Sequence, residues 1–182
     1  TLKQYVKVHQ DFYPRFSEEI LMKCLKDFEM QPDVNFKHLS MGQKKKIYMS
    51  FAVASCCQLL LMDEPTNGLD IPSKALFRKV IAGNLPADSS LIISTHQVHD
   101  VEQLLTHVFI LNNSEMLVNA SVEDIAKEYE FSYRNSNEMD SSVLYAEPSL
   151  QGNAVIARRK PDSPETTINL ELLFNAATLG KL

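Results

Sequence analysis

The sequence predicts an α/β fold built around a parallel sheet. Two short apolar runs, residues 59–62 and 91–93, have the length and flanks of buried strands. Both alternate along the chain with segments of helical periodicity, which is the pattern of parallel strands joined by helices. Residues 108–111 and 116–118 flank a polar turn and predict a hairpin at the edge of this sheet.

Length and composition exclude several classes of protein. The chain has 182 residues, 45% apolar and 23% charged, which is ordinary for a folded protein of one domain with an appended piece. A net charge of −5 gives no overall basic footprint for coating a nucleic acid duplex. No apolar run is long enough to cross a bilayer. Three cysteines, an odd count, argue against a disulfide framework and for a reducing compartment.

The helices of the first half are predicted from start signals and apolar faces. Ser17 is a plausible N-cap for a helix over residues 18–28. Ser40 begins a second helix that extends to about residue 57, because Gln43 stands at the capping-box spacing. Pro72 favours a third helix from residue 72 to 81, and a fourth helix is expected at about 98–105. Residues 31–38 are predicted to be a loop, and residues 1–12 show no clear pattern.

The last third of the chain is less regular. Residues 132–142 are polar and lack a hydrophobic pattern, so we expect a linker or mobile loop there. A second hairpin is expected from residues 143–147 and 154–157 around Gly152. Residues 170–177 predict a short closing helix.

Two adjacent acids, Asp63 and Glu64, follow the first strand. Ligands of open parallel sheets bind at the carboxyl ends of the strands, and an acid there usually has an ion or solvent as partner. The pair favours a phosphate site in which Asp63 holds Mg²⁺, directly or through water, and Glu64 polarises the attacking water. An ordinary strand end with a solvated acidic turn explains the pair alone equally well.

Two further segments strengthen the phosphate hypothesis. The helix start at Ser40 offers free N–H groups, a hydroxyl and, at Gly42, close access to the backbone, although a plain capping box is favoured on spacing alone. His96 follows the second strand and can reach the same sheet edge, although a lone surface histidine is the commoner situation. No Cys or acid completes a zinc site with His96 and His99. The run 44–46, three lysines, is expected to be a solvated basic face.

In this order the segments resemble the motifs of the ATPase subunits of ABC transporters. Residues 39–43 resemble the signature motif, and 59–64 resemble Walker B with its catalytic glutamate. Residues 67–70 look like the D-loop, and 94–96 look like the switch-histidine loop. The resemblance covers roughly residues 12–177, and the residues after the signature and Walker B look like those of bacterial exporter-type subunits.

The resemblance implies a P-loop NTPase fold of the ABC type, present here in part. Residues 1–131 would be the C-terminal part of the nucleotide-binding domain, with a helical subdomain at about 12–57 and the C-terminal half of the core sheet at about 58–131. A linker at 132–142 would lead to a small α/β extension at 143–182.

The resemblance also implies ATP hydrolysis with Mg²⁺ at the interface of a dimer. By this resemblance Glu64 and His96 would be catalytic, and Asp63 would bind Mg²⁺. Ser40, Gly42 and Gln43 would contact the ATP held by the opposite subunit. Asp70 would couple the two ATP sites of the dimer. The implied partners are a second ATPase subunit, identical or different, and an integral membrane permease at the cytoplasmic face of the inner membrane, with no nucleic acid. A non-transport ABC ATPase acting in translation or on DNA, and a non-enzymatic binding module, remain alternatives.

One motif of that family does not occur in the 182 residues. None of the five glycines belongs to a Gly-x-x-x-x-Gly-Lys-Ser/Thr loop, which wraps the phosphates of the nucleotide. The first residue is Thr1 rather than Met. We therefore expect the chain to be a fragment of a nucleotide-binding domain, and we expect the fragment by itself to be inactive.

Overall fold

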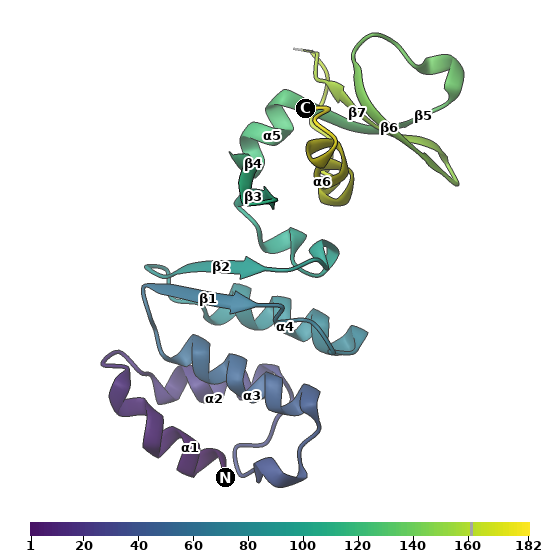
Figure 1. The fold of residues 1–182 in the computed structure, drawn as a ribbon. Helices are drawn as coiled ribbons and strands as arrows, with labels where there is room; N and C mark the ends of the chain where they lie inside the picture. The colour runs from purple at the N-terminus through teal and green to yellow at the C-terminus, as the bar shows by residue number, and fades with distance from the viewer. Residues whose placement is uncertain (161) are drawn as a thin grey trace. The chain divides into compact units, whose positions relative to one another are not determined.

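The computed structural model describes residues 1–160 and 162–182, which form two compact units, Thr1–Leu104 and Leu105–Leu182 (Figure 1). The first unit contains helices and two parallel strands, and the second contains two antiparallel sheets and two helices. The mixture of helix and sheet agrees with the predicted fold class.

Three helices make the hydrophobic core at the start of the first unit. They are α1 (Leu2–His9), α2 (Glu18–Asp27) and α3 (Met41–Ala54), with short 3-10 turns at Gln10–Phe12 and Phe36–His38. Their shared core consists of buried aliphatic side chains, Leu2, Leu21, Leu25, Ile47 and Ala54. The burial of these side chains holds α1 and α2 against α3.

The helix starts follow the predicted capping. The Ser17 hydroxyl accepts a hydrogen bond from the Ile20 amide, and Ser40 and Gln43 form a complete capping box at the start of α3. The helix α1, which no clear pattern predicted, begins with a capping box of its own between Thr1 and Gln4. A capping box satisfies amide donors that a helix N-terminus otherwise leaves free.

The parallel sheet consists of β1 (Leu59–Asp63) and β2 (Ser90–Ser94), joined by α4 (Ile71–Asn84). Asp70 caps α4, and Pro72 lies in its first turn, as predicted. In the register of the two strands Asp63 pairs with Ser94. The two strands therefore end side by side, which places the residues after them at one sheet edge.

Two predictions about this unit are wrong. The strands are not fully buried, since Leu59 and Leu61 are 53% and 67% exposed, while Met62 on the opposite face of β1 is covered. The helix expected at 98–105 is instead a pair of 3-10 turns, Val98–Asp100 and Glu102–Leu104. The apolar residues there recur every three positions, which suits the three residues per turn of a 3-10 helix.

The second unit opens with the predicted hairpin of β3 (His107–Asn112) and β4 (Glu115–Ser121). Its turn residues Asn113 and Ser114 both have positive φ, as two-residue hairpin turns require. The hairpin is a two-stranded sheet of its own among the described residues. Helix α5 (Val122–Glu128) follows it.

The rest of the second unit is a three-stranded antiparallel sheet with a helix. The strand order is β5-β7-β6, with β5 at Tyr129–Arg134, β6 at Val143–Ser149 and β7 at Gly152–Arg158. The β6–β7 hairpin and the closing helix α6 (Leu170–Thr178) agree with the sequence prediction. Buried side chains of β7 and α6, such as Ile156 and Leu173, form its core.

The predicted linker is partly ordered structure. Its first three residues, 132–134, complete β5, and Ser136–Glu138 forms a 3-10 turn. Arg134 pairs with Glu130 and Asp140, which ties the segment to the sheet. The boundary between the compact units follows Leu104, earlier in the chain than the expected domain end at residue 131. Within the described part of the chain, no helix has the length and apolar character needed to cross a membrane.

Candidate active site

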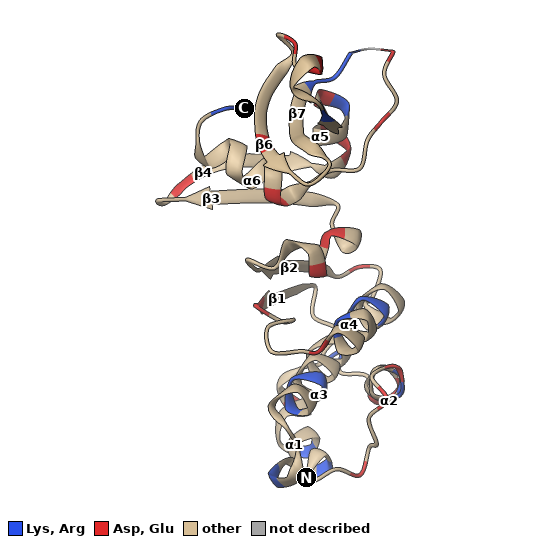
Figure 2. Cartoon of the chain, turned by 90° about the vertical axis from the view of Figure 1, so that its right-hand side faces the viewer, with Lys and Arg blue, Asp and Glu red and all other residues tan. Residues whose placement is uncertain are grey.

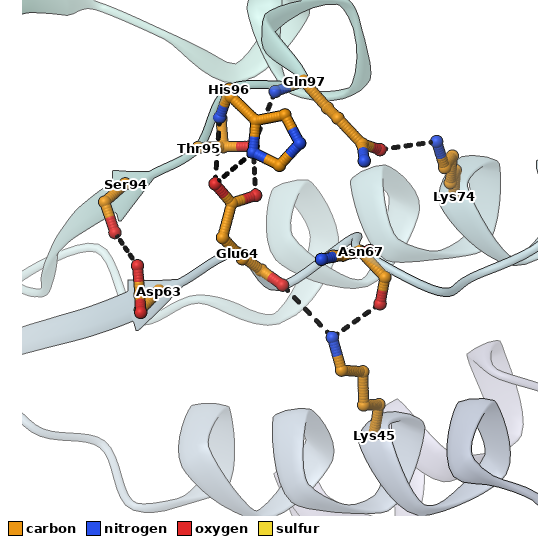
Figure 3. Close-up of polar contacts among 9 residues, drawn as sticks. All are labelled: Lys45, Asp63, Glu64, Asn67, Lys74, Ser94, Thr95, His96 and Gln97. Carbon is orange, nitrogen blue, oxygen red and sulfur yellow. Dashed lines mark hydrogen bonds and ion pairs between the residues drawn. The ribbon is translucent and has the colours of Figure 1, made fainter.

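The carboxyl ends of β1 and β2 bring the predicted acids and His96 together (Figure 3). Asp63 ends β1, and its carboxylate accepts a hydrogen bond of 2.5 Å from the Ser94 hydroxyl at the end of β2. The next residue, Glu64, donates its amide to the Ser94 carbonyl at 2.8 Å, so the ladder continues one residue past the strand. The parallel pairing thus decides which side chains meet at this edge.

Glu64 is the centre of a hydrogen-bonded cluster. Its Oε2 accepts from the Thr95 hydroxyl at 2.9 Å, and its Oε1 accepts from the His96 amide at 3.0 Å. The His96 ring adds a third contact, with Nδ1 2.6 Å from the same Oε1. Three donors from one loop therefore fix the direction of a single carboxylate.

These donors also set the ionisation of Glu64. Hydrogen bonding by the His96 side chain is the largest influence and lowers the pKa of Glu64, with smaller contributions from Thr95 and the His96 amide. The carboxylate is consequently ionised at neutral pH and able to accept a proton. An ionised carboxylate held in a fixed direction can accept a proton from a water molecule beside it.

The residues of the predicted signature lie at the N-terminus of α3. The Ser40 hydroxyl accepts from the Gln43 amide at 3.2 Å, and the Gln43 side chain accepts from the Ser40 amide at 2.9 Å. Both side chains are exposed. A Cβ on Gly42 would lie 3.8 Å from the Gly68 carbonyl oxygen, so this end of α3 packs on the loop after Glu64. Ser40 and Gln43 bond to each other and, among the described residues, not to the Glu64 cluster.

Asp70 has a structural role that is evident from its contacts. Its carboxylate accepts from the Ser73 amide at 2.9 Å and thereby caps α4. Hydrogen bonding by the Ser73 side chain, followed by its amide, lowers the pKa of Asp70. The side chain is exposed at the surface, so the cap leaves it open to a second molecule.

Two lysines for which the sequence predicted no contact at this edge support it. Lys45 reaches from α3 to the carbonyl oxygens of Glu64 and Asn67. Lys74 reaches from α4 to Gln97 Oε1 at 2.9 Å (Figure 3). Its ammonium also pairs with the Asp100 carboxylate at 2.8 Å. Both contacts join residues that are about 20 or more positions apart, so no local pattern could have indicated them.

The oxygen ligands at this edge suit a magnesium ion. Asp63 and the Ser94 hydroxyl supply hard oxygen donors, which Mg²⁺ prefers over nitrogen or sulfur. In the described part of the chain, no cluster of three or more His, Cys, Asp or Glu could hold a metal alone. That donor set fits an ion held by one carboxylate with waters and substrate phosphates, which is the usual magnesium arrangement.

A protein-family model described as "AAA domain, putative AbiEii toxin, Type IV TA system" matches residues 25–99. The matched range contains the N-terminus of α3, both parallel strands and the Glu64 cluster. It therefore covers every site residue that the sequence predicted.

Curated relatives are similar to part of this chain and are longer than the matched segment. The ABC transporter ATP-binding protein YtrB of Bacillus subtilis is 24% identical over 130 residues, which are 71% of this chain and 44% of YtrB. An uncharacterized ABC transporter ATP-binding protein of Methanocaldococcus jannaschii is 31% identical over 91 residues, which are 50% of this chain and 35% of the relative. The chain spans less than half the length of these two relatives.

Solved structures share the fold. The structure of a "putative Cobalt transport ATP-binding protein" superposes with a TM-score of 0.59 at 16% identity, over 88% of this chain and 60% of that one. The structure of an ATP-binding subunit of an ABC transporter gives a TM-score of 0.58 at 22% identity, over 69% of this chain and 54% of that one. The described residues thus share the fold of part of an ABC-type nucleotide-binding domain, and the sequence is similar to ABC transporter ATP-binding proteins over part of their length.

Proposed function

We propose that the full-length protein hydrolyses ATP and that Glu64 activates the attacking water. The observation that carries this proposal is the triple contact of the Glu64 carboxylate with Thr95 and His96 at the carboxyl edge of the sheet. An ionised carboxylate with a fixed direction accepts a proton from water as the water attacks the terminal phosphate. ATP is proposed as the substrate because both relatives described above are named as ATP-binding proteins.

The neighbouring residues have complementary tasks in this proposal. Asp63 and Ser94 would hold Mg²⁺, which neutralises charge on the phosphates when it is bound. His96 orients Glu64 through its ring and its amide, and its exposed ring remains available to a terminal phosphate. The sheet edge thus supplies the water-activating half of a phosphate site.

The other half of the site would come from a second subunit. The exposed N-terminus of α3, with Ser40, Gly42 and Gln43, would contact the γ-phosphate of ATP held by the partner. The helix dipole attracts anions, and the capping box pairs the Ser40 and Gln43 amides but not that of Gly42. Asp70, exposed at the cap of α4, would link the two sites. The dimer would drive a membrane permease from the cytoplasmic face of the membrane, as the names of transporter subunits among the relatives suggest.

The proposal is tested by Glu64→Gln in the full-length protein. The amide keeps the size of the side chain but cannot accept the proton from water, so hydrolysis should fall by roughly 10²–10⁴-fold. Binding of ATP should be retained. Steady-state phosphate release and equilibrium binding of ATP measure the two effects separately.

Glu19→Gln on α2 is the matched control, because Glu19 is an exposed glutamate outside the cluster. Hydrolysis by Glu64→Gln at the rate of this control would refute the catalytic role. A wild-type protein that binds ATP without hydrolysing it would favour a non-enzymatic binding module.

A further inference from the structure

We infer that Lys45 is a positioning residue of the proposed active site, which holds the turn carrying Glu64 against helix α3. The inference rests on the proposed function of Glu64 and extends it to a side chain outside the reacting groups. It differs from the expectation that the run 44–46 is a solvated basic face.

The Lys45 ammonium donates to two main-chain carbonyls of one turn (Figure 3). Its Nζ lies 3.2 Å from the Glu64 carbonyl oxygen and 2.5 Å from that of Asn67. The Asn67 amide also donates to the Glu64 carbonyl, at 3.3 Å. Lys45 therefore bridges the first and last residues of the turn over residues 64–67. A charged donor makes a stronger hydrogen bond to a carbonyl than a neutral donor does.

The turn needs such support because Glu64 has an unfavourable backbone conformation. Its φ is 44°, in the left-handed region, where a residue with a Cβ is strained. This conformation directs the Glu64 side chain toward Thr95 and His96 while its carbonyl faces α3. A strained residue stays in place only when its surroundings hold it, and Lys45 holds the carbonyl end.

The neighbouring lysines have different surroundings. Successive residues on a helix point about 100° apart, so three consecutive side chains cannot share one face. Lys44 lines a surface hollow with Tyr5 and Phe36, and Lys46 lies near enough to Asp70 to lower the pKa of that carboxyl. Only Lys45, of these three, hydrogen-bonds through its side chain to the turn of Glu64 in the described structure.

This contact connects the two functional parts of the site. The start of α3, with Ser40 and Gln43, already packs on the following loop through the Gly42–Gly68 approach. Lys45 lies about one turn further along the same helix and donates a hydrogen bond to the carbonyl of Glu64, the proposed water-activating residue. A shift of α3 is thus transmitted to Glu64 through a direct side-chain contact. Displacement of a catalytic group by about 1 Å can cost roughly 10²-fold in rate.

The test compares Lys45→Met with Lys44→Met in the full-length protein. Both substitutions remove one charge from α3, but only the first removes donors from the turn. We expect kcat of Lys45→Met to fall about 10-fold or more, with KM for ATP changed less than about twofold, since the residue positions the base rather than the nucleotide. Lys45→Arg, which keeps a charged donor, should recover most of the rate, and Lys44→Met should match wild type.

Two parallel measurements separate the possible failures. If Lys45→Met and Lys44→Met have the same kcat, or if Lys45→Met and Lys45→Gln lower the melting temperature far more than Lys44→Met, the positioning role is overturned. Glu64→Gln is measured alongside. A Glu64→Gln rate equal to wild type would overturn the proposed function and this inference with it, whereas an inactive Glu64→Gln beside an unaffected Lys45→Met would overturn this inference alone.

Discussion

His96 contacts Glu64 through its amide and its ring, so the two contacts can be separated by mutation. His96→Ala removes the ring and leaves the hydrogen bond from the backbone amide to Glu64. In the full-length protein we expect hydrolysis to fall by roughly 10²-fold, because the carboxylate loses its orientation, while ATP binding changes little. If binding of ATP and of ADP both collapsed, the histidine would have a structural role and the account of His96 would be wrong.

The same variant changes the pH dependence. The His96 side chain is the largest cause of the lowered pKa of Glu64, so its removal raises that pKa. In the proposed role Glu64 is a base only when it is ionised, so activity should be lost as the pH falls through its pKa. In a plot of kcat against pH, the fall in kcat on the acid side should therefore occur at higher pH in His96→Ala than in wild type. A fall at an unchanged pH would contradict the assignment, and His107→Ala on β3 serves as the control.

At the residue scale, sequence reasoning found the groups that adjoin one another in the chain. Asp63 and Glu64 follow an apolar strand, and His96 follows the next one, so the topology of a parallel sheet predicts that they meet. Lys45 and Lys74 escaped prediction because their contacts depend on how α3 and α4 pack on the loops. The cap formed by Asp70 is different, because it is a contact between residues three positions apart, and an acid just before the helix start at Pro72 is a local signal that could have indicated it.

At the element scale, the N-terminus of α3 combines a structural and a proposed functional role. Ser40→Ala removes the capping hydroxyl, and the loss should lower the free energy of unfolding by about 1 kcal/mol. Ser17→Ala on α2 removes an equivalent cap and should cost about the same. Only Ser40→Ala should also weaken hydrolysis in the full-length protein. Denaturant melts and phosphate release test both effects, and equal hydrolysis by the two variants would remove Ser40 from the site.

Local signals predicted elements well where start residues and periodicity agreed. Ser17 and Ser40 mark α2 and α3 correctly, and Asn113 with Ser114 marks the β3–β4 turn. The expected helix at 98–105 failed because a spacing of three satisfies a 3-10 turn as well as one face of an α-helix.

At the scale of the whole molecule, the described residues provide the acids and the histidine of the proposed phosphate site, and the sequence contains no glycine-rich phosphate loop. We expect the 182-residue chain alone to bind Mg-ATP weakly, because several converging donors are needed to hold a triphosphate. Titration calorimetry measures this, with circular dichroism to establish that the chain is folded. A dissociation constant in the low micromolar range would show that these residues suffice for nucleotide binding.

The identity of the nucleotide retained by the Glu64→Gln variant tests the central claim most directly. Full-length protein is incubated with Mg-ATP, freed of unbound nucleotide on a sizing column and quenched, and the bound nucleotide is separated and quantified. If Glu64 activates the water, the variant retains ATP on an associated, dimer-sized species, while wild type retains mainly ADP. ADP at the wild-type proportion on the variant would show that the terminal phosphate is cleaved without this carboxylate, and would contradict the account.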